Sequence, residues 1–314
     1  NYTFVNESRN TIKDILERNI KKKIVVIGPC SIHDPESALE YAERLSKIIK
    51  ENNFPNLFIV MRVYFEKPRT ITGWKGLIMD PDLDNSCNIK KGLEMARSLM
   101  IKITNLKVPI GLEFLDTISP QYISDLVSWG AIGARTSESQ LHRQLASGLS
   151  VPIGFKNSTE GNVEVALHSI LSARASHTFL GVNNKGMASI VTTNGNNDTH
   201  IILRGGKHPN YYEETINFTC ELSRLHHIKP NIMIDCSHGN SLKQSKNQIK
   251  VVKYICDYLA KKRYNIIGIM VESNIFQGKQ KLNTKEELEY GISITDECVG
   301  WSEGVEILKK INSI

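Results

Sequence analysis

Lys23-Ile-Val-Val-Ile-Gly28 is a short apolar run that predicts a buried β-strand, and residues 35–50 after it have the apolar spacing of a helix. The same pair of elements recurs along the whole chain. The predicted strands cover residues 23–28, 58–63, 108–114, 131–135, 152–156, 200–204, 232–236 and 266–272. The predicted helices lie near residues 35–50, 88–104, 119–129, 139–147, 162–174, 211–226, 242–261 and 302–312.

Apolar strands that are each followed by a helix are typical of a parallel sheet covered by helices on both faces. Eight such units most naturally close into a (β/α)8, or TIM, barrel, and this α/β fold is our prediction. The alternative is an open doubly wound sheet, but no glycine-rich dinucleotide fingerprint follows the first strand. We expect an N-terminal extension with a short helix over residues 1–22, a catalytic barrel over 23–314 and an inserted β-hairpin at about 178–193.

The composition of the 314 residues, 40% hydrophobic and 23% charged, excludes a disordered, collagen-like or coiled-coil chain. No apolar run is long enough for a membrane span, and the first residues lack a signal-peptide pattern. The six cysteines form no CxxC pair, so we expect reduced thiols and a cytoplasmic location. The net charge of +6 suits anionic small molecules, and no dense basic stripe with interleaved aromatic residues supports a nucleic-acid partner.

Basic side chains gather at the predicted strand ends and in the loops after them, which is where barrels of this kind carry their chemistry. They are Arg62, Lys67, Arg69, Arg135, Lys156 and Arg204. Arginine offers a bidentate fork for phosphate or carboxylate, and lysine offers a movable point charge. So many cations at one mouth repel one another unless anions bind, so we expect ligands with several anionic groups, such as two phosphorylated substrates. A basic rim that only aids solubility is the alternative, and acids would normally interleave with such a rim.

A second set of side chains combines a thiol, an imidazole and two carboxylates. Its members are Cys30, His238, Glu272 and Asp296. These groups suit one divalent metal ion, and manganese, iron, cobalt, zinc and copper all remain possible from ligand softness. The grouping depends on barrel closure, which makes the first and last strands neighbours. Taken alone, Cys30 is more often a small buried residue, and His238 is more often a loop histidine with satisfied hydrogen bonds.

Several long motifs stand in a fixed order along the chain. They are Gly28-Pro-Cys-Ser-Ile-His-Asp34, Lys67-Pro-Arg-Thr70 and Asp235-Cys-Ser-His-Gly-Asn240, with further segments at 61–66, 73–76, 128–136, 154–157, 203–207, 271–273 and 293–296. Together they resemble the 3-deoxy-D-arabino-heptulosonate 7-phosphate (DAHP) synthases of the type I, feedback-regulated branch. The resemblance covers nearly all of the chain from about residue 11 onward, and motifs of this length and order are highly specific.

The resemblance implies the first step of the shikimate pathway to chorismate and the aromatic amino acids. In that reaction, phosphoenolpyruvate condenses with D-erythrose 4-phosphate and water to give DAHP and phosphate. The four thiol, imidazole and carboxylate residues match the family's metal ligands. The match to the phosphoenolpyruvate anchors comprises Arg62, Lys67, Arg135, Lys156 and Arg204, and the sugar-phosphate contacts match the segment with Arg69 and Thr70. The expected catalytic residues are Lys67, which assists the metal at the aldehyde oxygen, His238 as metal ligand, and Glu113, which orients the water.

The resemblance also implies an aromatic amino-acid inhibitor and a homo-oligomer, either a dimer or a tetramer. The inhibitor-pocket matches are Pro120, Gln121, Leu145, Leu149, Ser150, Phe179, Gly181 and Val191. Gly181 stands where phenylalanine-sensitive relatives tend to have serine, which leaves room for a phenol and favours tyrosine, although a strand-end glycine has a structural explanation too. In relatives, a segment before the position of residue 1 contributes to this site and to the subunit contact, so we expect weaker feedback in a chain without it.

Two other enzyme or binding functions stay open at this point. A sister synthase that uses arabinose 5-phosphate shares the barrel and phosphoenolpyruvate, but the Lys67-Pro-Arg-Thr70 segment argues against it. A non-catalytic amino-acid sensor on the same fold is the other alternative. Loss of a metal ligand would favour the sensor, and all four ligand positions keep their residues.

Overall fold

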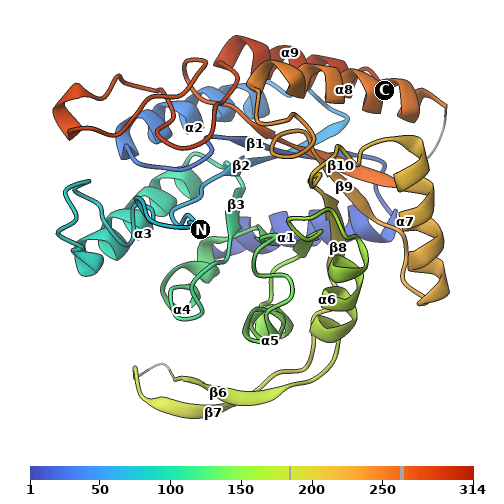
Figure 1. Cartoon of the computed structure of the whole chain (residues 1–314), viewed down its shortest axis with the longest axis horizontal. Helices are drawn as coiled ribbons and strands as arrows, with labels where there is room; N and C mark the ends of the chain where they lie inside the picture. The colour runs from blue at the N-terminus through green and yellow to red at the C-terminus, as the bar shows by residue number, and fades with distance from the viewer. Residues whose placement is uncertain (184, 262–264) are drawn as a thin grey trace.

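The computed structural model describes residues 1–183, 185–261 and 265–314. Eight parallel strands close into a barrel in the order β1-β10-β9-β8-β5-β4-β3-β2 (Figure 1). These strands are β1 (Lys23–Gly28), β2 (Leu57–Arg62), β3 (Ile110–Glu113), β4 (Trp129–Ile132), β5 (Ile153–Lys156), β8 (Thr199–Leu203), β9 (Ile232–Asp235) and β10 (Ile266–Glu272). Pairing of β1 with both β2 and β10 closes the sheet, so the (β/α)8 prediction is confirmed and the open sheet is excluded.

Helices surround the barrel, because each carries an apolar face that must be buried against the sheet (Figure 1). They are α2 (Pro35–Lys50), α3 (Ile89–Asn105), α5 (Gln140–Gly148), α6 (Glu164–Arg174), α7 (Glu213–Leu225), α8 (Ser245–Ala260) and α9 (Trp301–Asn312). The start of α2 shows how local sequence determines where a helix begins. The Asp34 side chain accepts hydrogen bonds from the backbone N–H groups of Glu36 and Ser37, and Pro35 occupies the first turn.

Helix α1 (Tyr2–Glu17) covers the amino-terminal end of the barrel. It has 16 residues and is therefore longer than the short helix predicted for the N-terminal extension. Its buried Ile12, Ile15 and Leu16 pack with barrel-interior side chains such as Ile24 and Trp129. This packing stabilises the helix over most of the N-terminal extension. Helix α1 and the side chains that fill the barrel close this end, and the cleft described below lies at the carboxyl ends of the strands.

The structure corrects the prediction around the fourth barrel strand. The helix predicted over 119–129 is only α4 (Pro120–Ile123), followed by the 3₁₀ turn η1 (Ser124–Leu126). The strand predicted over 131–135 is β4, which begins at Trp129 and ends at Ile132. Trp129 pairs with Gly111 of β3 and is fully buried inside the barrel, so a bulky aromatic that fits a helical face belongs to the sheet. Arg135 consequently lies in the turn after the strand.

The inserted hairpin is present and stands outside the barrel sheet. Strands β6 (Thr178–Val182) and β7 (Ala188–Thr192) pair antiparallel between β5 and β8 in the sequence. Figure 1 shows the hairpin extending away from the barrel. Asn184, in the predicted turn, lies outside the described residues. Among the helices of the described residues, none has the length and apolar character needed to cross a membrane.

Candidate active site at the carboxyl end of the barrel

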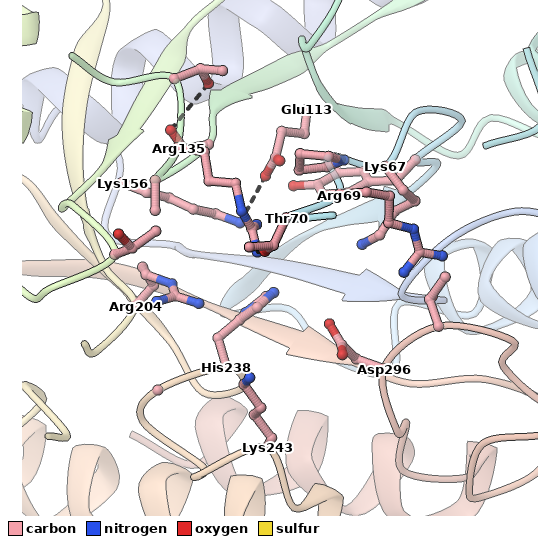
Figure 2. Close-up of a pocket in the computed structure, with 18 of the residues that line it drawn as sticks. Lys67, Arg69, Thr70, Glu113, Arg135, Lys156, Arg204, His238, Lys243 and Asp296 are labelled. Carbon is pink, nitrogen blue, oxygen red and sulfur yellow. Dashed lines mark hydrogen bonds and ion pairs between the residues drawn. The ribbon is translucent and has the colours of Figure 1, made fainter. Parts of the chain in front are cut away.

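A cleft of about 370 Å³ opens at the carboxyl ends of the barrel strands. All of the predicted basic residues line it, namely Arg62, Lys67, Arg69, Arg135, Lys156 and Arg204. Figure 2 shows the labelled members of this set directed into the cleft, with His238 and Asp296 on another side of it. The barrel therefore brings the cationic set and part of the thiol, imidazole and carboxylate set to one place.

Lys156 sits among acids at the base of the cleft. Its Nζ lies 2.8 Å from Oε2 of Glu113 and 3.7 Å from Oδ2 of Asp235. Burial favours the neutral form of Glu113, but the adjacent ammonium of Lys156 outweighs it and holds the pKa of Glu113 at about 2. Glu113 is thus an ionised carboxylate facing the cleft, able to accept a hydrogen bond from water.

Arg135 and Arg204 have a different environment from Lys156. Arg135 donates a hydrogen bond to the hydroxyl of Thr70 at 3.2 Å, and the Arg204 guanidinium donates to the carbonyl of Gly205 at 3.4 Å. Neither guanidinium forms an ion pair with a carboxylate of the described residues. Two arginines without an acidic partner, beside a lysine on the neighbouring strand, form a cradle with room for anions.

Arg62 lies deeper and is fully buried. Its Nη2 donates a hydrogen bond to Oε1 of Glu272 at 3.0 Å, and its guanidinium carbon lies 4.0 Å from the ring centroid of Tyr64. Burial opposes the charged form of Arg62, whereas Tyr64 and Glu272 favour it and raise its pKa above the usual range. Arg62 therefore supplies a fixed positive charge at the floor of the cleft and orients Glu272.

The residues predicted to bind metal come together from three neighbouring strands. Ligand atoms of Cys30, Glu272 and Asp296 all lie within 4.8 Å of one another. His238, in the loop after β9, places Nε2 3.5 Å from Oε1 of Glu272. The pairings β1–β10 and β10–β9 bring these positions together, which is the closure that the prediction required.

The charges at this cluster fit a divalent cation. Burial raises the pKa of the Cys30 thiol to about 11, and the negative charge of Glu272 adds to this effect. Such a thiol stays protonated beside the buried Glu272 until a cation supplies positive charge and takes the thiolate as ligand. One sulfur, one imidazole nitrogen and two carboxylates are also a donor set that first-row divalent metals accept.

Lys67 reaches the edge of the same cluster. Its Nζ lies 3.2 Å from Sγ of Cys30. Burial by itself would lower the pKa of Lys67, but Cys30 and Glu272 raise it above the usual range. Lys67 is therefore a protonated amine between the metal ligands and the loop that carries Arg69 and Thr70.

The sequence predicted no site role for Asp235 or Lys243. Asp235, the last residue of β9, is buried behind the cleft with Oδ2 2.8 Å from Nδ1 of His238, and the signal for it was its position at a strand end in the Asp-Cys-Ser-His motif. Lys243 lines the cleft and has a left-handed backbone at φ 59°. The prediction placed Lys243 inside a helix over 242–261, whereas α8 starts at Ser245.

The residues predicted for the inhibitor pocket come from α4, the end of α5 and the hairpin. Figure 1 shows α4 and α5 on the side of the barrel from which the hairpin extends. The end of α5 contacts the base of the hairpin, where the hydroxyls of Ser147 and Thr193 lie 2.7 Å apart. Phe179 and Val191 are cross-strand partners, and a Cβ at Gly181 would lie 2.8 Å from Cγ2 of Val191. The three hairpin residues predicted for the inhibitor pocket are thus close to one another.

Comparisons with known proteins agree with this geometry. The sequence profile of the DAHP synthetase I family matches residues 5–309. The phenylalanine-sensitive phospho-2-dehydro-3-deoxyheptonate aldolase of Escherichia coli K12 is 51% identical over 307 residues, which cover 98% of this chain and 87% of the relative. The tryptophan-sensitive enzyme of the same organism is 47% identical over 312 residues, covering 99% and 89%.

A solved structure shares the whole architecture. The phospho-2-dehydro-3-deoxyheptonate aldolase of Francisella tularensis SCHU S4 superposes with a TM-score of 0.96 at 48% identity, covering 99% of this chain and 91% of that one. The family resemblance inferred from the motifs is confirmed over nearly the full chain. On the strength of the profile match and these relatives, the protein belongs to the DAHP synthetase I family.

Proposed function

We propose that the protein condenses phosphoenolpyruvate with D-erythrose 4-phosphate and water to give DAHP and phosphate, the first step of the shikimate pathway. One observation carries the proposal: a cradle of basic residues lines a cleft that His238 and Asp296 also line, and Asp296 lies within 4.8 Å of the ligand atoms of Cys30 and Glu272. The relatives' names support it, because each is a phospho-2-dehydro-3-deoxyheptonate aldolase. The intact Lys67-Pro-Arg-Thr70 segment favours the four-carbon sugar phosphate over arabinose 5-phosphate.

Substrate binding follows from the positions of the cations. Arg135, Lys156 and Arg204 follow or end strands β4, β5 and β8, which are consecutive in the barrel, and they bind the phosphate and carboxylate of phosphoenolpyruvate. Arg69 and Thr70 bind the phosphate of the sugar from the loop after β2. Holding both anions in one cleft replaces an encounter of two dissolved molecules by an intramolecular geometry.

The bond changes then use groups already beside the substrates. The metal, when bound by Cys30, His238, Glu272 and Asp296, supplies Lewis-acid polarisation of the aldehyde. The protonated Lys67 donates a hydrogen bond, and then a proton, to the aldehyde oxygen as C3 of phosphoenolpyruvate forms a bond to the aldehyde carbon. Positive charge develops at C2 of phosphoenolpyruvate. Glu113 orients the water that adds to C2, and one proton of that water returns to Lys67. The bond between C2 and the phosphate oxygen then breaks as the C2 ketone forms, and the remaining hydroxyl proton leaves with the phosphate.

The structure around Glu113 is consistent with a fixed role. A Cβ built at Gly133 would lie 2.6 Å from Oε1 of Glu113, so any larger residue at this position would displace the carboxylate. Its other oxygen is held by Lys156. Lys156 therefore holds Oε2, and Gly133 leaves the space beside Oε1 open, so that this oxygen can accept a hydrogen bond from water.

We also propose feedback inhibition by an aromatic amino acid, with tyrosine preferred, in a homo-oligomer. The pocket would be formed by the turn at Pro120 and Gln121, the segment with Leu145, Leu149 and Ser150, and the hairpin face with Phe179, Gly181 and Val191. The metal would be manganese, iron, cobalt or zinc. The names of the phenylalanine- and tryptophan-sensitive relatives support regulation by this class of molecule.

The proposed reaction is tested by phosphate release from phosphoenolpyruvate in three parallel assays. Release should require both erythrose 4-phosphate and a divalent metal, and arabinose 5-phosphate should support little or none. Equal release with arabinose 5-phosphate would assign the sister activity instead. No release with either sugar, from folded and metal-loaded protein, would favour the amino-acid sensor.

A further inference from the structure

Asp235 is fully buried and lies between His238 of the metal cluster and Lys156 of the anion cradle. Its Oδ1 accepts a hydrogen bond from the backbone N–H of Ser237 at 3.0 Å, which fixes the carboxylate plane. Its Oδ2 lies 2.8 Å from Nδ1 of His238 and 3.7 Å from Nζ of Lys156. A single carboxylate oxygen therefore faces the imidazole of the metal cluster and the ammonium of the anion cradle.

The imidazole of His238 is held between two acids. Its Nδ1 lies 2.8 Å from Oδ2 of Asp235, although the ring is not turned to make a directed hydrogen bond to it, and its Nε2 lies 3.5 Å from Oε1 of Glu272 on the side of the metal cluster. The backbone of His238 is left-handed at φ 52°. A non-glycine residue keeps this conformation only where its neighbours hold it in place. A small rotation of the ring would align the Nδ1–H with this carboxylate, which would keep the proton on Nδ1 and leave the lone pair of Nε2 for a metal.

The ammonium of Lys156 is also shared between two acids. Glu113 accepts its hydrogen bond at 2.8 Å, and Asp235 lies farther away at 3.7 Å. The negative charge of Asp235 therefore offsets part of the positive charge that Lys156 offers to an anionic substrate. Removing this charge should have opposite effects on the two ligands, because it weakens the metal site and strengthens the positive potential of the cradle.

We propose that Asp235 is a positioning residue that orients His238 for metal through Nε2 and moderates the charge of Lys156. The inference rests on the proposed metal and phosphoenolpyruvate sites. If Asp235 only stabilised the end of β9, its replacement would weaken the binding of metal and the binding of phosphoenolpyruvate together. The signs of the two changes in affinity therefore distinguish the roles.

The test compares metal-free wild-type protein with Asp235→Asn, which keeps the shape of the side chain and removes its charge. Cobalt(II) affinity is measured from the absorption bands of the bound ion, without any assay of activity. Phosphoenolpyruvate affinity is measured by calorimetry on the metal-free proteins. We expect cobalt binding to weaken about 10- to 100-fold, and phosphoenolpyruvate binding to be equal or tighter.

Asp80→Asn is the matched control, because Asp80 is also buried but lies outside the cleft and accepts a hydrogen bond from the backbone N–H of Asn85. It should leave cobalt affinity unchanged. Cobalt affinity of Asp235→Asn equal to that of the wild type would overturn the inference, as would a joint loss of both ligands. Failure of wild-type protein to bind cobalt would instead refute the proposed metal site itself.

A second measurement uses wild-type protein and does not depend on how the variant folds. Histidine labelled with ¹⁵N in the zinc-loaded protein reports which ring nitrogen carries the proton. For His238 we expect the proton on Nδ1, facing Asp235, and the metal on Nε2. A metal bound to Nδ1 would overturn the proposed role of Asp235.

Discussion

Arg62 and Glu272 form a fully buried ion pair at the floor of the cleft, with Nη2 of the arginine 3.0 Å from Oε1 of the glutamate. Glu272 also accepts a hydrogen bond from the hydroxyl of Ser237 at 2.7 Å. Burial alone would keep Glu272 neutral, but His238 and Arg62 outweigh it and lower its pKa to about 2. The metal cluster therefore contains a carboxylate that is ionised at neutral pH and rigidly held.

This pair makes Arg62 a stability residue as well as a binding residue. Arg62→Met leaves Glu272 without its arginine partner in the interior, which should lower the free energy of unfolding by about 3–5 kcal/mol. Urea denaturation of the metal-free protein measures the change. The control is Arg97→Met, because Arg97 and Asp125 form an exposed pair at 2.8 Å, worth about 0–1 kcal/mol. Equal losses in the two variants would contradict the prediction.

Removal of the metal should abolish turnover. A chelator that strips the ion should stop DAHP formation, and added manganese or a similar divalent ion should restore it. Cys30→Ala should lose activity, because it removes a metal ligand. It should keep the circular dichroism spectrum of the wild type, because alanine fits the small buried space of the thiol. Full turnover by extensively chelated protein would show that the Cys30 cluster is not a catalytic metal site.

The cradle predicts a specific kinetic effect. Arg135→Ala, Lys156→Ala and Arg204→Ala each leave an anionic oxygen of phosphoenolpyruvate without its partner, at a cost of about 2–5 kcal/mol in kcat/KM for that substrate. Lys309→Ala, in an exposed pair on α9, serves as the control and should behave as wild type. Wild-type kinetics in all three cradle variants would show that phosphoenolpyruvate binds elsewhere.

The sequence predicts the barrel and the members of the site because both depend on local patterns. Apolar runs followed by helices determine the strand count, and closure then places Cys30 beside Glu272. Asp235 was not predicted as a site residue, because its role depends on the distances from one oxygen to His238 and Lys156, two positions that a linear motif cannot relate. Trp129 was assigned to a helix because burial inside a barrel cannot be distinguished from burial of a helical face by periodicity alone.

The interior of the barrel predicts a pH dependence of stability. His200 accepts a hydrogen bond from the indole N–H of Trp129 at 3.2 Å, and burial lowers its pKa from 6.5 to about 3. Between these values the unfolded chain binds a proton that the folded chain does not. The stabilisation is complete above pH 6.5 and is lost as the pH falls toward 3, by about 1.4 kcal/mol per pH unit.

Denaturation at about pH 5 and 6 measures this slope. His200→Gln should remove that part of the slope, because glutamine does not titrate. His226→Gln, at an exposed position, should leave the slope unchanged. A slope in His200→Gln equal to that of the wild type would assign the acid sensitivity to other groups.

The hairpin predicts the preference of the inhibitor site. A side chain at Gly181 would approach Cγ2 of Val191, so serine there fills the space that we assign to the phenol of tyrosine. We expect tyrosine to inhibit the wild type more than phenylalanine or tryptophan, and Gly181→Ser to prefer phenylalanine. Binding at the hairpin would shift the loop with Lys67 and Thr70, and a coupling of about 1–3 kcal/mol would weaken erythrose 4-phosphate binding about 5- to 150-fold.

Inhibition curves for the three amino acids on wild type and Gly181→Ser measure both the preference and its change. Thr192→Ser is the control, because Thr192 lies at the exposed base of the same hairpin and should keep the wild-type preference. A Gly181→Ser variant with unchanged preference would remove the argument for tyrosine. If none of the three amino acids inhibited the wild type, the hairpin would have another role, because barrel closure proceeds from β5 directly to β8 and does not require it.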